Sequence, residues 1–161
     1  MGTNKRTAVI VSGYFDPLHI GHLDMLEDAA SRGDAVIAIV NNNAQQEMKK
    51  GMVISDQADR LRIVSSLRVV DHAFVAVDDD RTVSASIEKA VADHGSTYDD
   101  FVFGNGGDRR PEFVPEAAVC ERLGIELVFD LGGTDKSDSS SRINMELGLT
   151  DQPSPPPSTT T

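Results

Sequence analysis

Two histidines three residues apart follow a glycine turn near the start of the chain. His19 and His22 come shortly after a β-rich apolar run that ends at Ser12-Gly13. At this spacing they share one face at the N-terminal end of a helix, which we expect to begin near His19. A helix N-terminus binds anions, because its N–H groups are unpaired and its dipole end is positive. Two imidazoles there can donate hydrogen bonds to phosphoryl oxygens, whereas two ligands alone would make a poor zinc site.

Each of these features has an ordinary explanation when it stands alone. A histidine pair at this spacing is usually a surface coincidence, and a glycine after a strand is usually a plain turn. Here the strand, the glycine turn, Asp16, both histidines and the helix start occur together within a few residues. This conjunction favours a site for a phosphorylated ligand.

The run from Gly13 to His22, GYFDPLHIGH, resembles the G-x-F-D-x-x-H-x-G-H signature of the cytidylyltransferase-like nucleotidylyltransferases. The similarity extends from about Thr7 to about Leu147 in the order of elements and motifs. The tetrapeptide HIGH also occurs in class I aminoacyl-tRNA synthetases. This chain of 161 residues is too short for one of those enzymes and has no clear second lysine signature.

The resemblance implies roles for individual residues of the first motif. The catalytic residues that it implies are His19, His22 and Lys50, and the nucleotide-binding residues are Gly13, Tyr14, Phe15 and Gly21. Asp16 resembles the aspartate that organises the acceptor side. Tyr14 stands where the family usually has Thr or Ser, so we expect its phenol to reshape the acceptor pocket. The resemblance also implies that Arg60 supports the site. The alternatives are a solvated pair in a loop for Lys49-Lys50 and a surface salt bridge for Arg60.

Two later segments also match elements of the family. The segment Gly104–Arg110, GNGGDRR, follows an expected strand, and the resemblance implies nucleotide contacts from Gly104 and Asp108. Arg109 and Arg110 are candidates for the acceptor, because guanidinium groups match phosphate oxygens in pairs. A run of hydroxyl residues opens the last expected helix, and these also count as nucleotide-binding: Ser139, Ser140 and Ser141. Their alternatives are a plain glycine loop and ordinary helix capping.

Short apolar strands alternate with helical segments along the chain. The expected strands are 7–12, 35–40, 73–77, 101–103 and 125–129, and the expected helices are 19–32, 55–67, 83–92, 111–123 and 139–147. This alternation predicts an α/β fold with a Rossmann-like, doubly wound, five-stranded parallel sheet in a single domain, residues 1–150. Ligands of such sheets bind at the carboxyl ends of the strands. The loops expected there are 13–18, 41–52, 78–80, 104–110 and 132–139.

Charge and composition argue against nucleic-acid and membrane partners. A net charge of -11 argues against a nucleic-acid partner, which would need a broad basic face. The longest apolar run, Ala35–Val40, is too short to span a membrane. A single cysteine, Cys120, permits no disulfide within the chain, and no signal-peptide pattern opens the sequence, so we expect a cytoplasmic protein.

The segment 151–161, DQPSPPPSTTT, has almost no apolar residues. We expect a disordered tail or an interdomain linker to a second catalytic domain. This arrangement resembles that of bifunctional enzymes of fosfomycin biosynthesis, in which a small cytidylyltransferase domain precedes a phosphoenolpyruvate mutase domain. The composition fits a plain frayed terminus equally well.

The expected reaction is transfer of CMP from CTP to a small phosphonate or phosphate acceptor, with release of pyrophosphate. The resemblance implies Mg²⁺ bound through the triphosphate, with no metal held by the protein itself. It favours 2-hydroxyethylphosphonate as acceptor. The alternatives are glycerol 3-phosphate, a sugar phosphate, adenylyl transfer from ATP, or a non-catalytic nucleotide-binding module. Whether two copies form a homodimer stays open.

Overall fold

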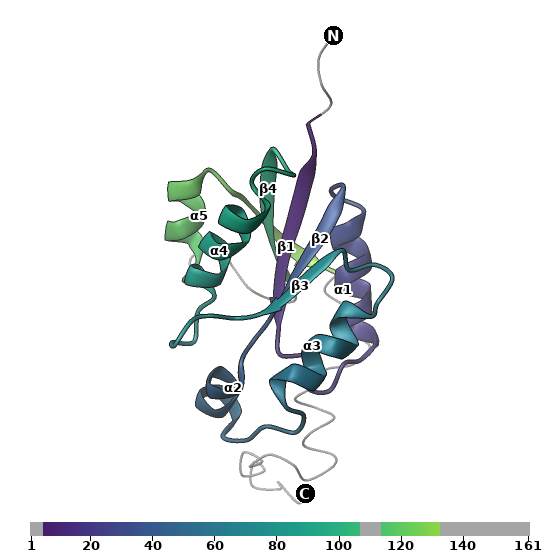
Figure 1. The fold of residues 1–161 in the computed structure, drawn as a ribbon, viewed down its shortest axis with the longest axis vertical. Coiled ribbons are helices and arrows are strands. Elements are labelled where there is room, and N and C mark those ends of the chain that lie inside the picture. The colour runs from purple at the N-terminus through teal and green to yellow at the C-terminus, as the bar shows by residue number, and fades with distance from the viewer. Residues whose placement is uncertain (1–4, 107–113, 133–161) are drawn as a thin grey trace, which may run out of the picture.

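A five-stranded parallel sheet forms the centre of the computed structural model, which describes residues 5–106 and 114–132 (Figure 1). The strands are β1 (Thr7–Gly13), β2 (Ala35–Val40), β3 (His72–Val75), β4 (Asp100–Gly106) and β5 (Glu126–Leu131). Their order is β3-β2-β1-β4-β5, and every neighbouring pair is parallel. The order therefore reverses direction between β1 and β4, which is the switch point where ligands bind in such sheets.

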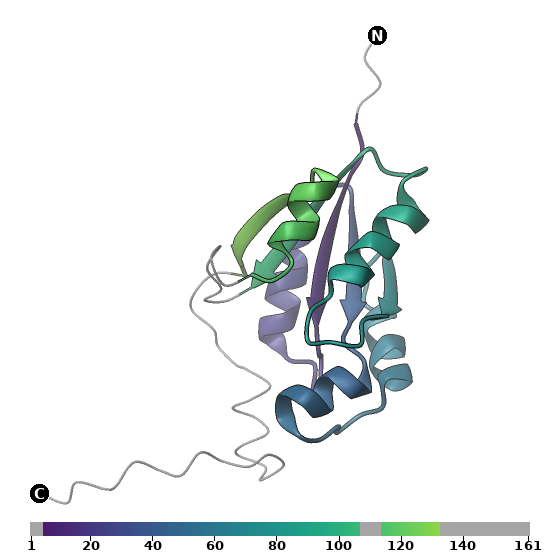
Figure 2. The same ribbon diagram turned by 90° about the vertical axis from the view of Figure 1, so that its left-hand side faces the viewer.

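Helices cover both faces of this sheet. The helices are α1 (Ile20–Ala30), α2 (Asn43–Lys50), α3 (Gln57–Ser65), α4 (Ser84–His94) and α5 (Ala117–Leu123). α1 and α3 lie on one face of the sheet, and α4 and α5 lie on the other (Figure 2). Side chains of α1 and α3 pack with Val9, Val11 and Val36, and those of α4 and α5 pack in a separate cluster. The fold is thus a doubly wound, Rossmann-like α/β domain, as the alternation of elements predicts. Among the described residues, no helix has the length and apolar character needed to cross a membrane.

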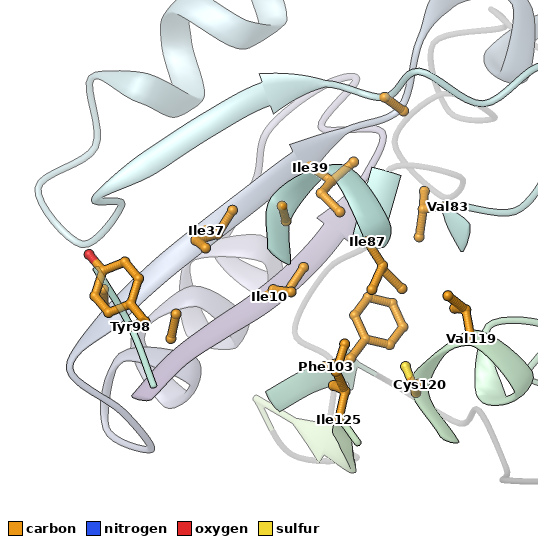
Figure 3. Packing of buried hydrophobic residues seen from close by; sticks show 14 residues of the cluster. Ile10, Ile37, Ile39, Val83, Ile87, Tyr98, Phe103, Val119, Cys120 and Ile125 are labelled. Carbon is orange, nitrogen blue, oxygen red and sulfur yellow. The ribbon is translucent and has the colours of Figure 1, made fainter. Parts of the chain in front are cut away.

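The strands form because continuous apolar runs are buried on both faces. All six residues of β2 are buried, and its boundaries are those expected from the sequence. On the α4–α5 face, Ile10, Ile37 and Phe103 pack beneath Ile87 and Cys120 (Figure 3). Cys120 is buried in this core, and burial raises the pKa of its thiol to about 11.

One helix was not expected. The segment Asn41–Met52 has the composition of a polar loop, yet Asn43–Lys50 forms α2, past the carboxyl ends of the strands (Figure 1). The Asn42 side chain accepts a hydrogen bond from the Gln45 N–H, and the Gln45 side chain accepts one from the Asn42 N–H. This reciprocal capping box and a left-handed Gly51 at the C-terminal end define the helix.

Other expected boundaries also need correction. The helix expected over 111–123 begins at Ala117 within the described residues, after Pro115. Asp78, in the loop expected at 78–80, is buried and caps α4, because its carboxylate accepts hydrogen bonds from the N–H groups of Ala85 and Ser86. The helix expected over 139–147 and the tail 151–161 lie outside the described residues.

Gly104 lies inside β4 and not in the loop that the sequence suggested. It pairs with Val11 on one side and Val128 on the other, and β4 continues to Gly106. A Cβ built at Gly104 would overlap the Leu131 side chain, which is itself buried. Packing against β5 therefore gives a physical reason for a glycine here.

We expect Gly104→Ala to lower the free energy of unfolding by about 1–3 kcal/mol, because the added methyl group overpacks the core beside Leu131. Urea unfolding measures this change. In a Leu131→Ala background the same substitution should cost less, since the overlapping side chain is gone. An equal cost in both backgrounds would show that the contact with Leu131 is not the cause.

Candidate nucleotide-binding site

The two histidines cap the first helix. His19 is the N-cap residue of α1, and its Nδ1 accepts a hydrogen bond from the Gly21 N–H at 3.0 Å. In return, Nδ1 of His22 accepts a hydrogen bond from the His19 N–H at 3.3 Å. These contacts form a capping box with imidazoles in place of the usual side chains. Gly21, expected to contact the nucleotide, donates its N–H to His19.

The capping box determines which ring nitrogen carries the proton. A nitrogen that accepts a hydrogen bond has no proton, so the neutral form of each ring carries its proton on Nε2. The rings stack with centroids 3.9 Å apart, an arrangement in which two positive charges would repel each other. Each histidine therefore presents an Nε2–H donor beside the N-terminus of α1, where anions bind.

The ring of Phe15 packs against the ring of His22. Its backbone is left-handed, with φ of 53°, and its side chain is buried in the core with its ring centroid 4.9 Å from that of His22. A Cβ at Gly13 would lie 2.9 Å from Cζ of Phe15, so only glycine leaves room for the ring. The structure thus gives Gly13 and Phe15 a part in positioning His22, within the loop that the sequence singled out.

Asp16 joins the first loop to the segment between α2 and α3. Its side chain is fully buried, and one carboxylate oxygen accepts hydrogen bonds from Gln46 Nε2 at 3.1 Å and the Ile54 N–H at 2.9 Å. The other oxygen accepts from the Ser55 N–H at 2.9 Å. Its expected place on the acceptor side stays a prediction; the structure shows that its carboxylate connects the first loop to α2 and to the residues before α3.

Arg60 makes a second connection among the same loops. The residue is only 1% exposed, which corrects the surface salt-bridge alternative. Its guanidinium donates hydrogen bonds to four oxygens: Ser55 O, Tyr14 O, Asn41 O and Asn43 Oδ1, at 2.6–2.9 Å. Burial lowers the pKa of Arg60, and the nearby Asp16 carboxylate opposes that shift. Arg60 thus holds the ends of β1 and β2 together.

The lysine pair lies at the C-terminal end of α2, beside Tyr14. The Lys49 Nζ is 4.6 Å from the centre of the Tyr14 ring, and the Lys50 Nζ is 5.8 Å from it. Burial lowers the pKa of Lys50, and the Asp16 carboxylate acts in the opposite direction. The structure therefore brings Lys50 of α2 close to Tyr14 and Asp16 of the first loop.

Sequence reasoning missed two contributors to this arrangement, Gln46 and Asn43. Both lie on α2, so they could not be placed without that helix. The signal for it was present, because Asn42 followed three residues later by Gln45 is a capping-box pattern.

Several expected site residues lie outside the described residues: Asp108, Arg109, Arg110, Ser139, Ser140 and Ser141. Within residues 5–106 and 114–132, no group of three or more His, Cys, Asp or Glu side chains is arranged to hold a metal ion.

Comparison with known proteins identifies the protein family. The family model described as cytidylyltransferase-like matches residues 10–143, and the chain belongs to this family. The bifunctional protein HldE of Geobacter metallireducens is 32% identical over 87% of the chain, and the match covers 27% of HldE. The FAD synthase of Natrialba magadii is 35% identical over 79% of the chain and 78% of its own length.

A solved structure supports the fold. The crystal structure of the lipopolysaccharide core biosynthesis protein from Thermoplasma volcanium has a TM-score of 0.58 and 24% identity, covering 83% of this chain and 99% of that one. The HldE relatives are much longer than the stretch they share with this chain. These comparisons show the family; they do not show the fosfomycin-biosynthesis arrangement, a phosphonate acceptor or a preference for CTP.

We expect Arg60→Met to lower the free energy of unfolding by about 3 kcal/mol, because it leaves buried carbonyl oxygens without their donor. The matched control is Arg62→Met on the same helix, where the side chain is exposed. That change should stay within about 0.5 kcal/mol. Urea unfolding measures both changes. Equal losses of unfolding free energy in the two variants would show that Arg60 does not hold the ends of β1 and β2 together.

The burial of Lys50 predicts that its ammonium loses its proton below the ordinary lysine pKa of 10.5. Acetylation of Lys50, followed against pH by peptide mass spectrometry, should show a midpoint below that of N-acetyl-lysine amide. Asp16→Asn should lower the midpoint further, since it removes the charge that favours the protonated form. A midpoint at or above that of the reference amine would contradict the structure.

Proposed function

We propose that this protein transfers a nucleotidyl group from a nucleoside triphosphate to a small phosphonate or phosphate acceptor. An acceptor oxygen attacks the α-phosphorus, the bond between that phosphorus and the bridging oxygen breaks, and pyrophosphate leaves. The observation that carries the proposal is the histidine capping box at the N-terminus of α1, which presents two Nε2–H donors at the switch point of the sheet. Membership of the cytidylyltransferase-like family supports the reaction class.

The chain's own groups would act mainly by position and charge. An ionised acceptor is already a nucleophile, so the protein need not remove a proton. The Nε2–H groups of His19 and His22, and the N-terminus of α1, would stabilise charge that develops on the transferring and leaving phosphates. Lys50 would bring a positive charge from α2 to the same edge. The buried Asp16 and Arg60 keep these groups in place.

Magnesium is proposed as a partner of the triphosphate. The described residues offer no cluster of three protein ligands, so its ligands would be triphosphate oxygens and water. When bound, the ion would neutralise part of the triphosphate charge. The histidine donors fit beside such a complex, since they present protons and not lone pairs.

The proposed donor is CTP, on the likeness of the glycine segment that begins at Gly104 in β4 to that of small cytidylyltransferases. ATP is the alternative, because one relative is named FAD synthase and FAD contains an adenylyl group. The proposed acceptor is 2-hydroxyethylphosphonate, with glycerol 3-phosphate and sugar phosphates as alternatives. A pyrophosphate-release screen that crosses the four common triphosphates with these acceptors decides among them. Nucleotide binding without turnover in every combination would favour the non-catalytic module.

The histidine roles can be tested without removing the helix cap. His19→Asn and His22→Gln keep a capping-box pattern while removing the ring Nε2–H. We expect each variant to retain its melting temperature within a few degrees and to lose about 10²–10³ in kcat, the usual cost of one preorganised donor. Wild-type turnover in both purified variants would overturn the mechanism.

A further inference from the structure

A second pair of histidines lies at the amino ends of the strands, at the edge of the sheet opposite the nucleotide site. His72 is the first residue of β3, and His94 is the last residue of α4. Their ring centroids are 4.3 Å apart, and Nε2 of His72 forms a hydrogen bond with the hydroxyl of Tyr98 at 2.8 Å. The proposed reaction does not use this cluster of His72, His94 and Tyr98.

Tyr98 attaches the cluster to the core. It is 5% exposed and belongs to the buried cluster on the α4–α5 face (Figure 3). Its N–H donates a hydrogen bond to the His94 carbonyl at 3.0 Å, and its hydroxyl pairs with His72. β3 lies at one end of the strand order, beside β2. The cluster therefore connects the first residue of an edge strand to the segment that follows α4.

The ring pair tolerates one positive charge better than two. Two imidazolium rings with centroids 4.3 Å apart would repel each other, and both residues are partly buried, which weakens screening by salt. The hydrogen bond to Tyr98 is less sensitive to protonation, because a hydroxyl can donate to a neutral ring or accept from a charged one. A second proton therefore opposes the ring contact and leaves the hydrogen bond possible.

Charged groups of α4 act on His94 in both directions. Asp93 favours its charged form and Lys89 opposes it, and these two side chains form an ion pair with each other at 2.7 Å. The C-terminal end of a helix also favours a cation. Burial has the largest effect, followed by the charge of His72, and together they lower the pKa of His94.

Three other charged residues surround the cluster, and each precedes a strand: Arg6, Asp71 and Asp99. The guanidinium carbon of Arg6 is 5.0 Å from the centre of the Tyr98 ring, and the Asp99 carboxylate accepts the Arg6 N–H at 2.9 Å. The Asp71 carboxylate accepts the Val36 N–H at 2.8 Å. Both carboxylates are thus directed to backbone groups at the ends of other strands, and Arg6 adds a positive charge on the Tyr98 side.

We propose that the cluster of His72, His94 and Tyr98 is an acid-sensitive contact that holds β3 to the end of α4 and weakens when both imidazoles are protonated. The same strand and helix are also connected at the opposite edge, where Asp78, just after β3, caps the start of α4. Acid would therefore loosen one of these two connections and leave the other. This inference does not depend on the proposed reaction.

The lowered pKa of His94 gives the sign of the effect. In the unfolded chain His94 takes up its proton near the ordinary histidine pKa of 6.5, and in the folded chain it does so at a lower pH. Between these two values the unfolded chain binds more protons, so the stability of the fold rises with pH. The contribution of the neutral pair is present above pH 6.5 and is lost as the pH falls below it.

The experiment compares thermal unfolding of the full chain at about pH 8 and about pH 5.5, on either side of the ordinary histidine pKa, at constant ionic strength. The wild-type melting temperature should be lower at the acidic pH. In His94→Gln this fall should be smaller by about 2–4 °C, because glutamine takes up no proton. The His19–His22 pair is unchanged in this variant, so its own titration cancels from the comparison.

The matched control is Tyr98→Phe, which keeps the ring and removes the hydroxyl. It should lower the melting temperature by a similar amount at both pH values, because the hydroxyl pairs with either form of His72. A fall with pH that is equal in His94→Gln and in the wild type would overturn the inference. So would a Tyr98→Phe variant that abolishes the fall, since the hydroxyl and not the ring pair would then be acid-sensitive.

A second measurement follows the ring C–H signals of His94 by NMR as the pH is lowered. In His72→Gln the titration midpoint of His94 should lie above its wild-type value, because the like charge is gone. An unchanged or lower midpoint would show that the two rings are not coupled and would reject the proposal. The two measurements use different histidine variants, so if one variant fails to fold, the other decides.

Discussion

The buried charges Asp16 and Arg60 organise the carboxyl edge of the sheet. Asp16 accepts the backbone N–H of Ser55, and Arg60 donates to the carbonyl of the same residue. The guanidinium also reaches the carbonyls of Tyr14 and Asn41, which lie just past β1 and β2. Burial of either charge without partners would cost several kcal/mol, so the loops must keep the positions that satisfy both. The site groups on β1, α1 and α2 are placed by this requirement.

The parts of the fold that follow from local pattern could be predicted from the sequence. β2 has six buried apolar residues in a row, and such a run is typical of a strand covered on both faces. α2 was missed because its residues are polar and only Gln45 and Gln46 are buried, so no apolar periodicity marks it. Likewise, glycine at position 104 depends on Leu131, far along the chain, and no local pattern shows that contact.

The candidate site also has parts that could be predicted from the sequence and parts that could not. The histidine pair and the start of its helix could be predicted, since residue type, spacing and the preceding glycine all lie within one short segment. The burial of Arg60 could not be predicted, because three of its hydrogen bonds go to two distant segments, to Tyr14 after β1 and to Asn41 and Asn43 after β2. A charged residue on an expected helix is usually exposed, and only the tertiary structure reveals that its donors are satisfied by backbone oxygens. The cation–π contacts of Tyr14 depend on α2 and were hidden for the same reason.

The capping box makes helix formation and donor placement a single event. His19 and His22 use Nδ1 to satisfy N–H groups that the first turn of α1 would otherwise leave unpaired. That contact determines the tautomer, so a neutral ring carries its proton on Nε2. Folding of α1 therefore sets the protonation pattern and orientation of the donors before any ligand arrives. Preorganisation of this kind is what charge stabilisation in a transition state requires, because donors already in place need no reorganisation when charge develops.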